Sequence, residues 1–368
     1  MILFFSDLHF GIRSYSQQLE NGIFTAELEA RKALEEIYEA SCNPEISFII
    51  FGGDFFHTNQ PTSENIKFTI AWFKKMDALG KPFIIIPGNH DASLYSSGLA
   101  FLNSLVLINT TFVHESIFNT KWNNWNLVFI PYVYSNSMKD KDSKVDEDIV
   151  AEIDKAPSNT IIVAHLQEST AKIGSESIML SKGVNILDID ASYTTKNIIL
   201  LLGHIHKHQI YKKGYTTICY PGNTFYHDMA DRDEGKGYCV VDIDGSITFK
   251  DLSTIRKFIS MKVFNDDVAI FNSRRITGNQ VVFVYKQGER SHEYEEIVTK
   301  LLAEKNCILG KMIYFKDEDE LAAIDITSPI YDPYVMLETY LKDLEQPLDK
   351  EKALAWGKEY LQKGEETS

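Results

Sequence analysis

The stretch FIIIPGNHDA, residues 83–92, joins a run of four apolar residues through Pro-Gly to Asn89, His90 and Asp91. An apolar run of this length is typical of a strand buried in a sheet. Pro-Gly then turns the chain sharply. Asn, His and Asp are side chains that bind metal ions or transfer protons, so the stretch predicts a polar site at the end of a buried strand.

Four other apolar runs end in the same kind of residue. They are ILFFSDLH (2–9), FIIFGGDFFH (48–57), IIVAHL (161–166) and ILLLGHIHKH (199–208). Their ends carry Asp7 and His9, Asp54 and His57, His165, and His204 and His206. Taken singly, each cluster could be a turn, a cap or a histidine satisfied in the core. Because open α/β sheets bind ligands at the carboxyl ends of their strands, the five clusters together predict one shared site.

Segments with helical spacing separate the first strands, one around Leu28, Leu34 and Ile37 and another from Thr62 to Met76. Alternating strands and helices predict a layered α/β domain. Further strands follow one another without helices and predict a second, more antiparallel sheet; they lie at 216–220, 238–244 and 247–251. We interpret the charged segment KDKDSKVDED, 139–148, as a solvated loop.

The pattern changes after about Ser253. Two strand-like runs enclose the helical segment EYEEIVTKLLAEKN (293–306), which indicates a small α+β domain. The stretch from Asp332 to Gly364 predicts two amphipathic helices broken at Pro347. We therefore predict three domains, which cover residues 1–253, 254–328 and 329–368.

The chain has 368 residues and a net charge of −15. This charge argues against a protein that coats nucleic acid through its overall field, but not against a local binding site. No apolar run is long enough to cross a bilayer, and Asp7 interrupts the N-terminal MILFF before a signal-peptide core could form. With four cysteines and no CxxC pair, we expect a cytoplasmic protein that makes no contact with a membrane.

Imidazole, carboxylate and amide groups without cysteine form a ligand set for Mn²⁺, Fe²⁺ or Zn²⁺, and the oxygen content favours Mn²⁺, with Mg²⁺ as the alternative. The number of candidate ligands suits two divalent ions that share a bridging carboxylate. Two such ions, about 3.5–4 Å apart, can activate a water and stabilise a phosphate during in-line displacement. The expected reaction is hydrolysis of a phosphoester.

The order Asp-x-His, Gly-Asp, Gly-Asn-His-Asp, a single His and Gly-His-x-His resembles the calcineurin-like metallophosphoesterases. Within them, several stretches resemble the SbcD nucleases, counterparts of the Mre11 subunit of double-strand-break repair complexes, and phage recombination endonucleases; they are SDLHFG (6–11), GGDFFHTNQPTSE (52–64), PGNHD (87–91), GHIHK (203–207) and YPGNTFYHDMADRDEGKGYCVVDID (220–244). The resemblance covers roughly residues 1–250. It implies a four-layer α/β sandwich of two sheets flanked by helices, with a small α+β cap domain and a C-terminal helix pair.

The resemblance also implies roles for the strand-end residues. One metal ion would be held by Asp7, His9, Asp54 and His206, and the other by Asp54 as bridge with Asn89, His165 and His204. His90 would face the scissile phosphate and protonate or stabilise the leaving oxygen. His57 stands where superfamily phosphatases often have Asp, and it would support His90 or position DNA.

Two kinds of protein partner follow from the resemblance. The first is SbcC, a Rad-fifty-type ATPase. It would have to supply any ATP dependence, because this chain has no GxxxxGK[ST] loop of its own. The apolar faces of the C-terminal helices would bind it or pack on this chain; they comprise Met336, Leu337, Tyr340, Leu341, Leu344, Leu354, Trp356, Tyr360 and Leu361. The second is another copy of the chain, in a homodimer. The candidate interface residues are Phe68, Trp72, Phe101 and Leu102, and ordinary packing in the core of this chain would give the same pattern.

The leading hypothesis is a Mn²⁺-dependent DNA exonuclease and endonuclease subunit. Lys207, Lys212 and Lys213 would contact DNA, or they are ordinary surface lysines. A second hypothesis is a phosphatase or cyclic-nucleotide phosphodiesterase of the same superfamily. A third, from another class, is a non-catalytic scaffold, which the intact set of candidate ligands disfavours.

Overall fold

The computed structural model describes residues 1–19, 22–91, 98–132, 145–173, 186–189, 196–231, 234–264, 266–272, 276–278 and 280–316, with Lys352, Leu354 and Trp356. The chain separates into two compact units, Met1–Ile324 and Asp325–Ser368. Apart from those three residues, the predicted C-terminal helix pair lies outside the described residues. The large sheets and the candidate ligands belong to the first unit, and the predicted domain boundaries stay predictions.

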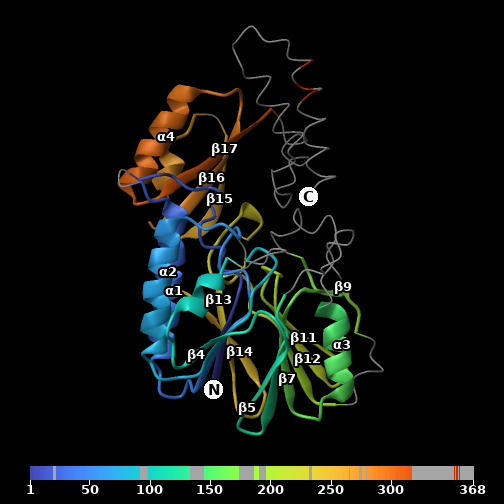
Figure 1. The fold of residues 1–368 in the computed structure, drawn as a ribbon. Coiled ribbons are helices and arrows are strands. Elements are labelled where there is room, and N and C mark those ends of the chain that lie inside the picture. Colours follow the sequence, from blue (N-terminus) through green and yellow to red (C-terminus); the bar gives the residue numbers. More distant parts are fainter. Residues whose placement is uncertain are drawn as a thin grey trace. The chain divides into compact units, whose positions relative to one another are not determined.

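Two six-stranded sheets form the body of this unit (Figure 1). The first has the order β14-β13-β1-β2-β3-β4, with β1 (Ile2–Phe5), β2 (Phe48–Phe51), β3 (Phe83–Ile85), β4 (Thr110–Phe112), β13 (Gly237–Val241) and β14 (Ile247–Asp251). The second has the order β11-β12-β10-β7-β6-β5, with β5 (Phe118–Trp122), β6 (Trp125–Phe129), β7 (Thr160–His165), β10 (Ile198–Gly203), β11 (Gln209–Lys213) and β12 (Thr216–Tyr220). Strands β1 to β4 run parallel, as do β6, β7, β10 and β12.

Helices cover the outer faces of both sheets, as Figure 1 shows. Helices α1 (Thr25–Ser41) and α2 (Ser63–Asp77) lie beside the first sheet, and α3 (Val145–Lys155) beside the second. The side chain of Thr62 caps α2 by accepting a hydrogen bond from Asn65 N. Phe4 and Leu201 belong to the core between the sheets, whereas Phe5 packs on Trp72 of α2. The predicted four-layer α/β sandwich is confirmed.

Two details of the sequence interpretation were wrong. The strands after residue 216 do not form a sheet of their own, because β12 joins β10 while β13 and β14 extend the first sheet beside β1. The segment 139–148 is not wholly a loop, since α3 begins at Val145. Three acidic residues occupy the first turn of α3, where the helix dipole favours negative charge.

The cap region is a parallel three-stranded sheet with one helix: β15 (Lys257–Val263), β16 (Gln280–Gln287), α4 (His292–Glu304) and β17 (Ile308–Phe315). Strand β15 was not predicted. Helix α1 holds the start of this region, because Glu36 accepts hydrogen bonds from Ser253 and Thr254. Glu29 of α1 also forms an ion pair with Arg256, with 3.3 Å between Nε and Oε1.

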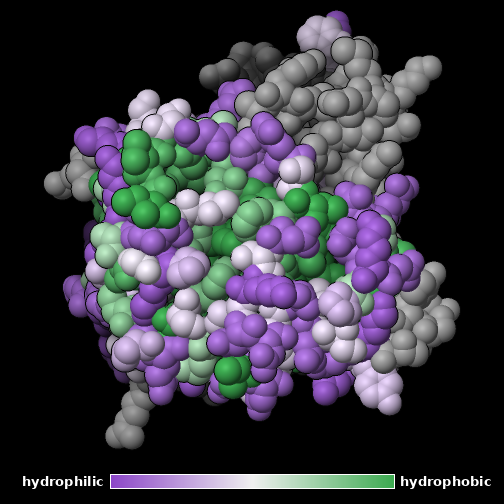
Figure 2. Space-filling model, turned by 60° about the horizontal axis from the view of Figure 1, so that its bottom comes forward, coloured by the Kyte–Doolittle hydropathy of each residue, from purple (hydrophilic) through white to green (hydrophobic). Residues whose placement is uncertain are grey.

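The remaining short elements are β8 (Gln167–Glu168), which pairs with β9 (Ile186–Leu187), and the 3₁₀ turns Ala100–Ser104, Met229–Asp231 and Ala269–Asn272. Among the described residues, no helix is long and apolar enough to cross a bilayer. Figure 2 shows hydrophobic groups set among hydrophilic ones on one face of the molecule. Of the four candidate dimer residues, Trp72 and Leu102 are buried within this chain, so core packing accounts for them.

Candidate metal centre

Polar residues from both sheets meet at the carboxyl ends of the parallel strands. Asp7, Asp54 and Asn89 follow β1, β2 and β3 of the first sheet. His165 ends β7, and His204 follows β10 in the second sheet. The structure therefore brings together the clusters that the sequence placed on separate strands.

The first group of candidate ligands consists of Asp7, His9, Asp54 and His206. The nearest ligand atoms of Asp7, His9 and Asp54 all lie within 4.8 Å of one another. His206 joins them through His9, with 3.0 Å between the two Nε2 atoms. All four side chains are buried.

The second group consists of Asp54, Asn89, His165 and His204. Asn89 Oδ1 lies 3.0 Å from His165 Nε2 and also 3.0 Å from His204 Nδ1. Asp54 Oδ2 lies 3.2 Å from His165 Nε2 and 3.6 Å from His9 Nε2. One carboxylate oxygen of Asp54 thus reaches both groups, which is the placement that a bridging ligand requires.

The backbone at several of these residues has an unfavourable conformation. The φ angles of Asp7, His9, Asp54 and His204 are 54°, 47°, 59° and 95°. Such angles are uncommon outside glycine, and they concentrate at functional sites where surrounding contacts hold them. Two of these contacts are hydrogen bonds from Asp7 N to Gly53 O and from His9 N to Asp54 O, each 3.0 Å long.

His90 lies at the edge of the two groups and is partly exposed. Its backbone N–H donates to Asp54 Oδ1 over 2.8 Å, and its Nδ1 lies 2.8 Å from the backbone carbonyl oxygen of His57. The His57 ring stacks beside it at 5.5 Å between ring centres. The carbonyl of His57, rather than its side chain, therefore fixes the orientation of His90.

Burial and neighbouring charges shift the pKa values of the buried groups at this site. Burial raises the pKa of Asp7 to about 7, with the charge of His165 opposing the shift and that of Asp54 adding to it. Burial would also raise the pKa of Asp54, but His165 and His90 lower it well below its ordinary value. Burial would lower the pKa of His165, yet Asp54 raises it to about 9. Only neutral imidazole binds a metal, so a cation bound at His165 would displace one of the two ring protons that the raised pKa favours.

The donor set fits divalent cations. Carboxylates, an amide oxygen and imidazoles converge. In several of these histidines, the second ring nitrogen is either held by the backbone or left without a hydrogen bond. His165 Nδ1 lies 2.8 Å from Gly52 O, while His204 Nε2 and His9 Nδ1 are buried without a hydrogen-bond partner. The ring nitrogens that face Asp54 Oδ2 and Asn89 Oδ1 lie 3.0–3.6 Å from these oxygens, and this convergence of nitrogen and oxygen donors indicates a place for a cation.

Two further residues lie beside the candidate ligands, Asp91 and His227. The sequence placed Asp91 next to Asn89 and His90 at a strand end, whereas it gave His227 no role. Asp91 is fully buried and ties two of the loops together, because its carboxylate accepts hydrogen bonds from the backbone of Phe55, Phe56 and Gly88. His227 forms a further candidate metal group with His9 and His206. It lies in the stretch 220–244 that carried the family resemblance, but no strand-end pattern marks it.

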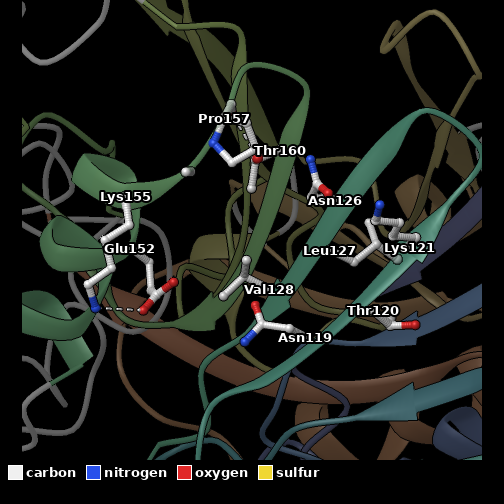
Figure 3. Close-up of a pocket in the computed structure, with 11 residues that line it drawn as sticks. Asn119, Thr120, Lys121, Asn126, Leu127, Val128, Glu152, Lys155, Pro157 and Thr160 are labelled. Atoms are coloured by element: carbon white, nitrogen blue, oxygen red, sulfur yellow. Dashed lines mark hydrogen bonds and ion pairs between the residues drawn. The ribbon is translucent and has the colours of Figure 1, made fainter.

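A separate cavity of about 570 Å³ lies between α3 and the β5–β6 hairpin (Figure 3). Asn126 of β6 and Thr160 of β7 line it near the starts of their strands. The candidate ligands follow the opposite ends of the parallel strands, so this cavity is not part of the metal centre.

A profile of the calcineurin-like phosphoesterases matches residues 1–208, more than half of the chain. The chain belongs to the calcineurin-like phosphoesterase family. The "DNA double-strand break repair protein Mre11" of Archaeoglobus fulgidus is 24% identical over 284 residues, which cover 74% of this chain and 59% of that protein. The protein of the same name from Saccharolobus solfataricus is 29% identical over 90 residues, 24% of this chain and 22% of that protein.

The chain therefore spans less than two thirds of the length of these curated relatives. Among solved structures, TT1561 of Thermus thermophilus aligns with a TM-score of 0.38 and 15% identity, covering 60% of this chain and 88% of that chain. Members of the family are metal-dependent phosphoesterases, which agrees with the predicted hydrolysis of a phosphoester.

Proposed function

We propose that this phosphoesterase is the nuclease subunit of an SbcD or Mre11 type, and that it hydrolyses DNA phosphodiesters with two divalent metal ions, Mn²⁺ in the first place. The observation that carries the proposal is the pair of ligand groups that share Asp54, with His90 at their edge. The similarity to Mre11 supports DNA as the substrate, because it extends over 284 residues, beyond the 208 that the family profile matches.

Each residue has a distinct part in this proposal. Asp7, His9, Asp54 and His206 would hold one ion, and Asp54, Asn89, His165 and His204 the other. When bound, the two ions would polarise the phosphate and supply the nucleophile from water at neutral pH. His90 would donate a proton or a hydrogen bond to the leaving oxygen, with the His57 carbonyl holding its ring in place.

The three lysines proposed to contact DNA carry little free positive charge. Lys207 Nζ lies 2.8 Å from Glu234 Oε1, and Lys213 forms an ion pair with Glu168. These pairs offset two of the three lysines, whereas Lys212 is exposed. The proposal therefore assigns most of the sequence-independent binding of DNA to a partner or to the metal ions themselves.

One assay separates the three hypotheses. The purified chain is incubated with Mn²⁺ and linear duplex DNA, and in parallel with bis-p-nitrophenyl phosphate, p-nitrophenyl phosphate and a cyclic nucleotide. We expect release of nucleotides from DNA and its loss in Asp54→Asn, which should also lose both metal ions. Turnover of only the small substrates would favour a phosphatase, and turnover of none, with metal bound, would favour a scaffold.

The partners in the proposal are an SbcC-type ATPase and a second copy of this chain. The sequence from residue 332 onward supplies the apolar helical faces proposed for the ATPase. Removing residues 332–368 should leave basal nuclease activity and abolish co-purification with the ATPase. Retained co-purification would contradict this assignment, and light scattering of the full chain would test the homodimer.

A further inference from the structure

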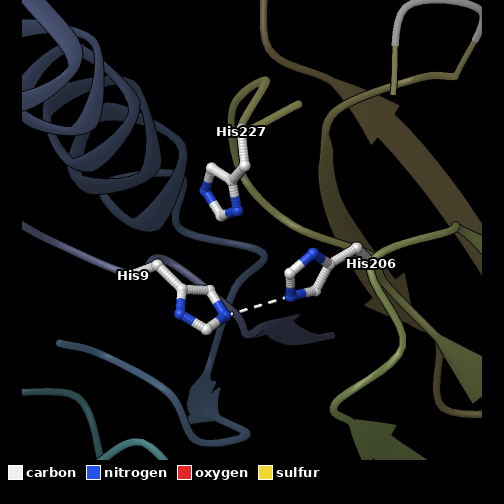
Figure 4. Close-up of side chains that lie close together, drawn as sticks. All are labelled: His9, His206 and His227. Carbon is white, nitrogen blue, oxygen red and sulfur yellow. Dashed lines mark hydrogen bonds between the residues drawn. The ribbon is translucent and has the colours of Figure 1, made fainter. Parts of the chain in front are cut away.

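A third histidine faces His9 and His206 from a different loop. His227 follows strand β12, and Figure 4 shows its ring directed toward the other two. Its ring centre lies 5.1 Å from that of His9 and 5.2 Å from that of His206. One nitrogen from each of the three rings lies within 4.8 Å of the others. Three imidazoles from three loops thus surround one point.

The His227 ring lacks ordinary partners of its own. The residue is only 4% exposed, and neither ring nitrogen has a hydrogen bond of normal geometry. Burial lowers the pKa of the His227 ring well below its ordinary value, and the nearby backbone of Leu8 opposes that shift. Metal-binding histidines commonly direct one nitrogen to a backbone carbonyl and the other to the ion, and His227 has neighbours of both kinds.

A buried ion pair builds the loop that carries His227. Asp231 Oδ2 accepts hydrogen bonds from His227 N over 2.9 Å and from Asn223 Nδ2 over 3.0 Å. Asp231 Oδ1 lies 3.2 Å from Lys236 Nζ, and both side chains are fully buried. These contacts fix the backbone at His227 and leave its ring for the site. A loop built in this way argues against accidental placement of the histidine.

We propose that His227 is an additional ligand of the metal ion in the group of Asp7, His9, Asp54 and His206. This inference rests on the proposed two-metal site. It gives the two halves of that site, the ligand groups of the first and the second ion, different numbers and kinds of ligands. The first half would have three imidazoles and two carboxylates, and the second two imidazoles, one carboxylate and one amide. Imidazole-rich sites favour Co²⁺ and Zn²⁺ over Mn²⁺, so the first half should prefer these ions more strongly than the second.

The test compares His227→Gln with the unaltered chain by calorimetric titration with Co²⁺ and Mn²⁺ and by the visible absorption of bound Co²⁺. We expect two ions per chain in both proteins. In the variant, one of the two Co²⁺ ions should bind at least about tenfold more weakly, with a smaller loss for Mn²⁺ and an altered Co²⁺ spectrum.

Two further variants make the result specific. His208→Gln is the control, because His208 lies in the loop that carries His204 and His206, but its ring stacks on Phe249 and its Nδ1 lies 2.9 Å from Tyr220 O. It should leave both Co²⁺ affinities unchanged. His227→Glu restores a ligand of similar reach, and it should recover Mn²⁺ affinity more fully than Co²⁺ affinity.

Unchanged affinities and spectrum in His227→Gln would overturn the inference, and slower hydrolysis alone would instead assign His227 to the substrate phosphate. Neither result would affect the proposed function, which fails only if the unaltered chain itself binds fewer than two ions or does not cleave DNA. If the variants do not fold, a crystal structure of the unaltered chain with Co²⁺ decides. A His227 nitrogen at about 2.0–2.3 Å from the ion supports the inference, and a longer distance overturns it.

Discussion

Replacing Gly88 with alanine adds one methyl group to the turn that carries Asn89 and His90. A Cβ atom on this backbone would lie 2.5 Å from the backbone nitrogen of Asp54 and 2.7 Å from its Cγ. Ordinary van der Waals contact with a Cβ begins at 3.4 Å. Asp54 Oδ1 would lie closer still, so Asp54 or the turn must move by at least about 0.9 Å, the difference between 3.4 and 2.5 Å at the backbone nitrogen.

This displacement is large for a metal site. Bonds between a metal and its ligands hold to within about 0.2 Å, so a shift several times larger removes Asp54 from its position. Because Asp54 reaches both ligand groups, both ions should be affected. A misplacement of about 1 Å can lower a rate by about 10²-fold, which corresponds to about 2.7 kcal/mol. We expect a loss of this size in hydrolysis, with weaker binding of both ions, although no ligand is removed.

Calorimetric titration with Mn²⁺ and hydrolysis of bis-p-nitrophenyl phosphate measure the two effects, and thermal unfolding shows whether the variant is folded. Gly98→Ala is the matched control, because its Cβ would meet its nearest neighbour, Asn59 Cα, at 3.4 Å. The control should behave as the unaltered chain. A folded Gly88→Ala variant that bound two ions with unaltered affinity and hydrolysed the substrate at the unaltered rate would contradict this reasoning. It would show that close packing of this turn on Asp54 does not position the ligands.

Three other substitutions test separate parts of the structure. His90→Asn should keep both metal ions and lower hydrolysis by about 10²–10⁴-fold, the usual contribution of a positioned acid, and an unchanged rate would exclude His90 from the mechanism. His57→Ser should slow degradation of duplex ends more than cleavage of single strands, because the carbonyl that holds His90 remains, and equal losses would contradict a positioning role. Burial would raise the pKa of Glu36, but the donors of Ser253 and Thr254 lower it below 4.5. Glu36→Gln should therefore reduce the free energy of unfolding by about 1 kcal/mol at pH 7. The difference should shrink as the pH falls below 4.5 and through the lowered pKa of Glu36, so equal differences in urea unfolding at neutral and at acid pH would refute this.

The sequence was sufficient to predict where the candidate ligands gather. An apolar run followed by Asp or His is a local pattern, and parallel pairing brings the ends of such runs to one edge of a sheet. The pairing partners of β13 and β14 were not predictable in the same way. Strand β13 is a short apolar run and β14 alternates apolar and polar residues, as many strands do. Only the antiparallel register of β13 on β1, with Leu3 opposite Val240, places them in the first sheet.

His227 shows why the rest of the site could not be predicted. It follows no apolar run directly, and its position depends on the Asp231 carboxylate, whose partners lie elsewhere in the loop and at Lys236. A single sequence contains the residues of such a loop but not their distances. His227 lies in the loop that leads from β12 of the second sheet to β13 of the first, and the antiparallel pairing of β13 with β1 places the start of β13 beside the end of β1, which His9 follows.

The backbone at the site points to a balance between stability and ligand placement. Glycine is the residue that best tolerates a positive φ, yet the chain has Asp7, His9, Asp54 and His204 at such angles. Each strained residue of this kind costs about 1–3 kcal/mol, which the buried strands beside it must offset. Glycine at these four positions would relieve strain but supply no side chain to the site. Four of the eight non-glycine residues with positive φ in the described part of the chain thus lie where carboxylates and imidazoles converge, as expected if ligand placement outweighs local stability there.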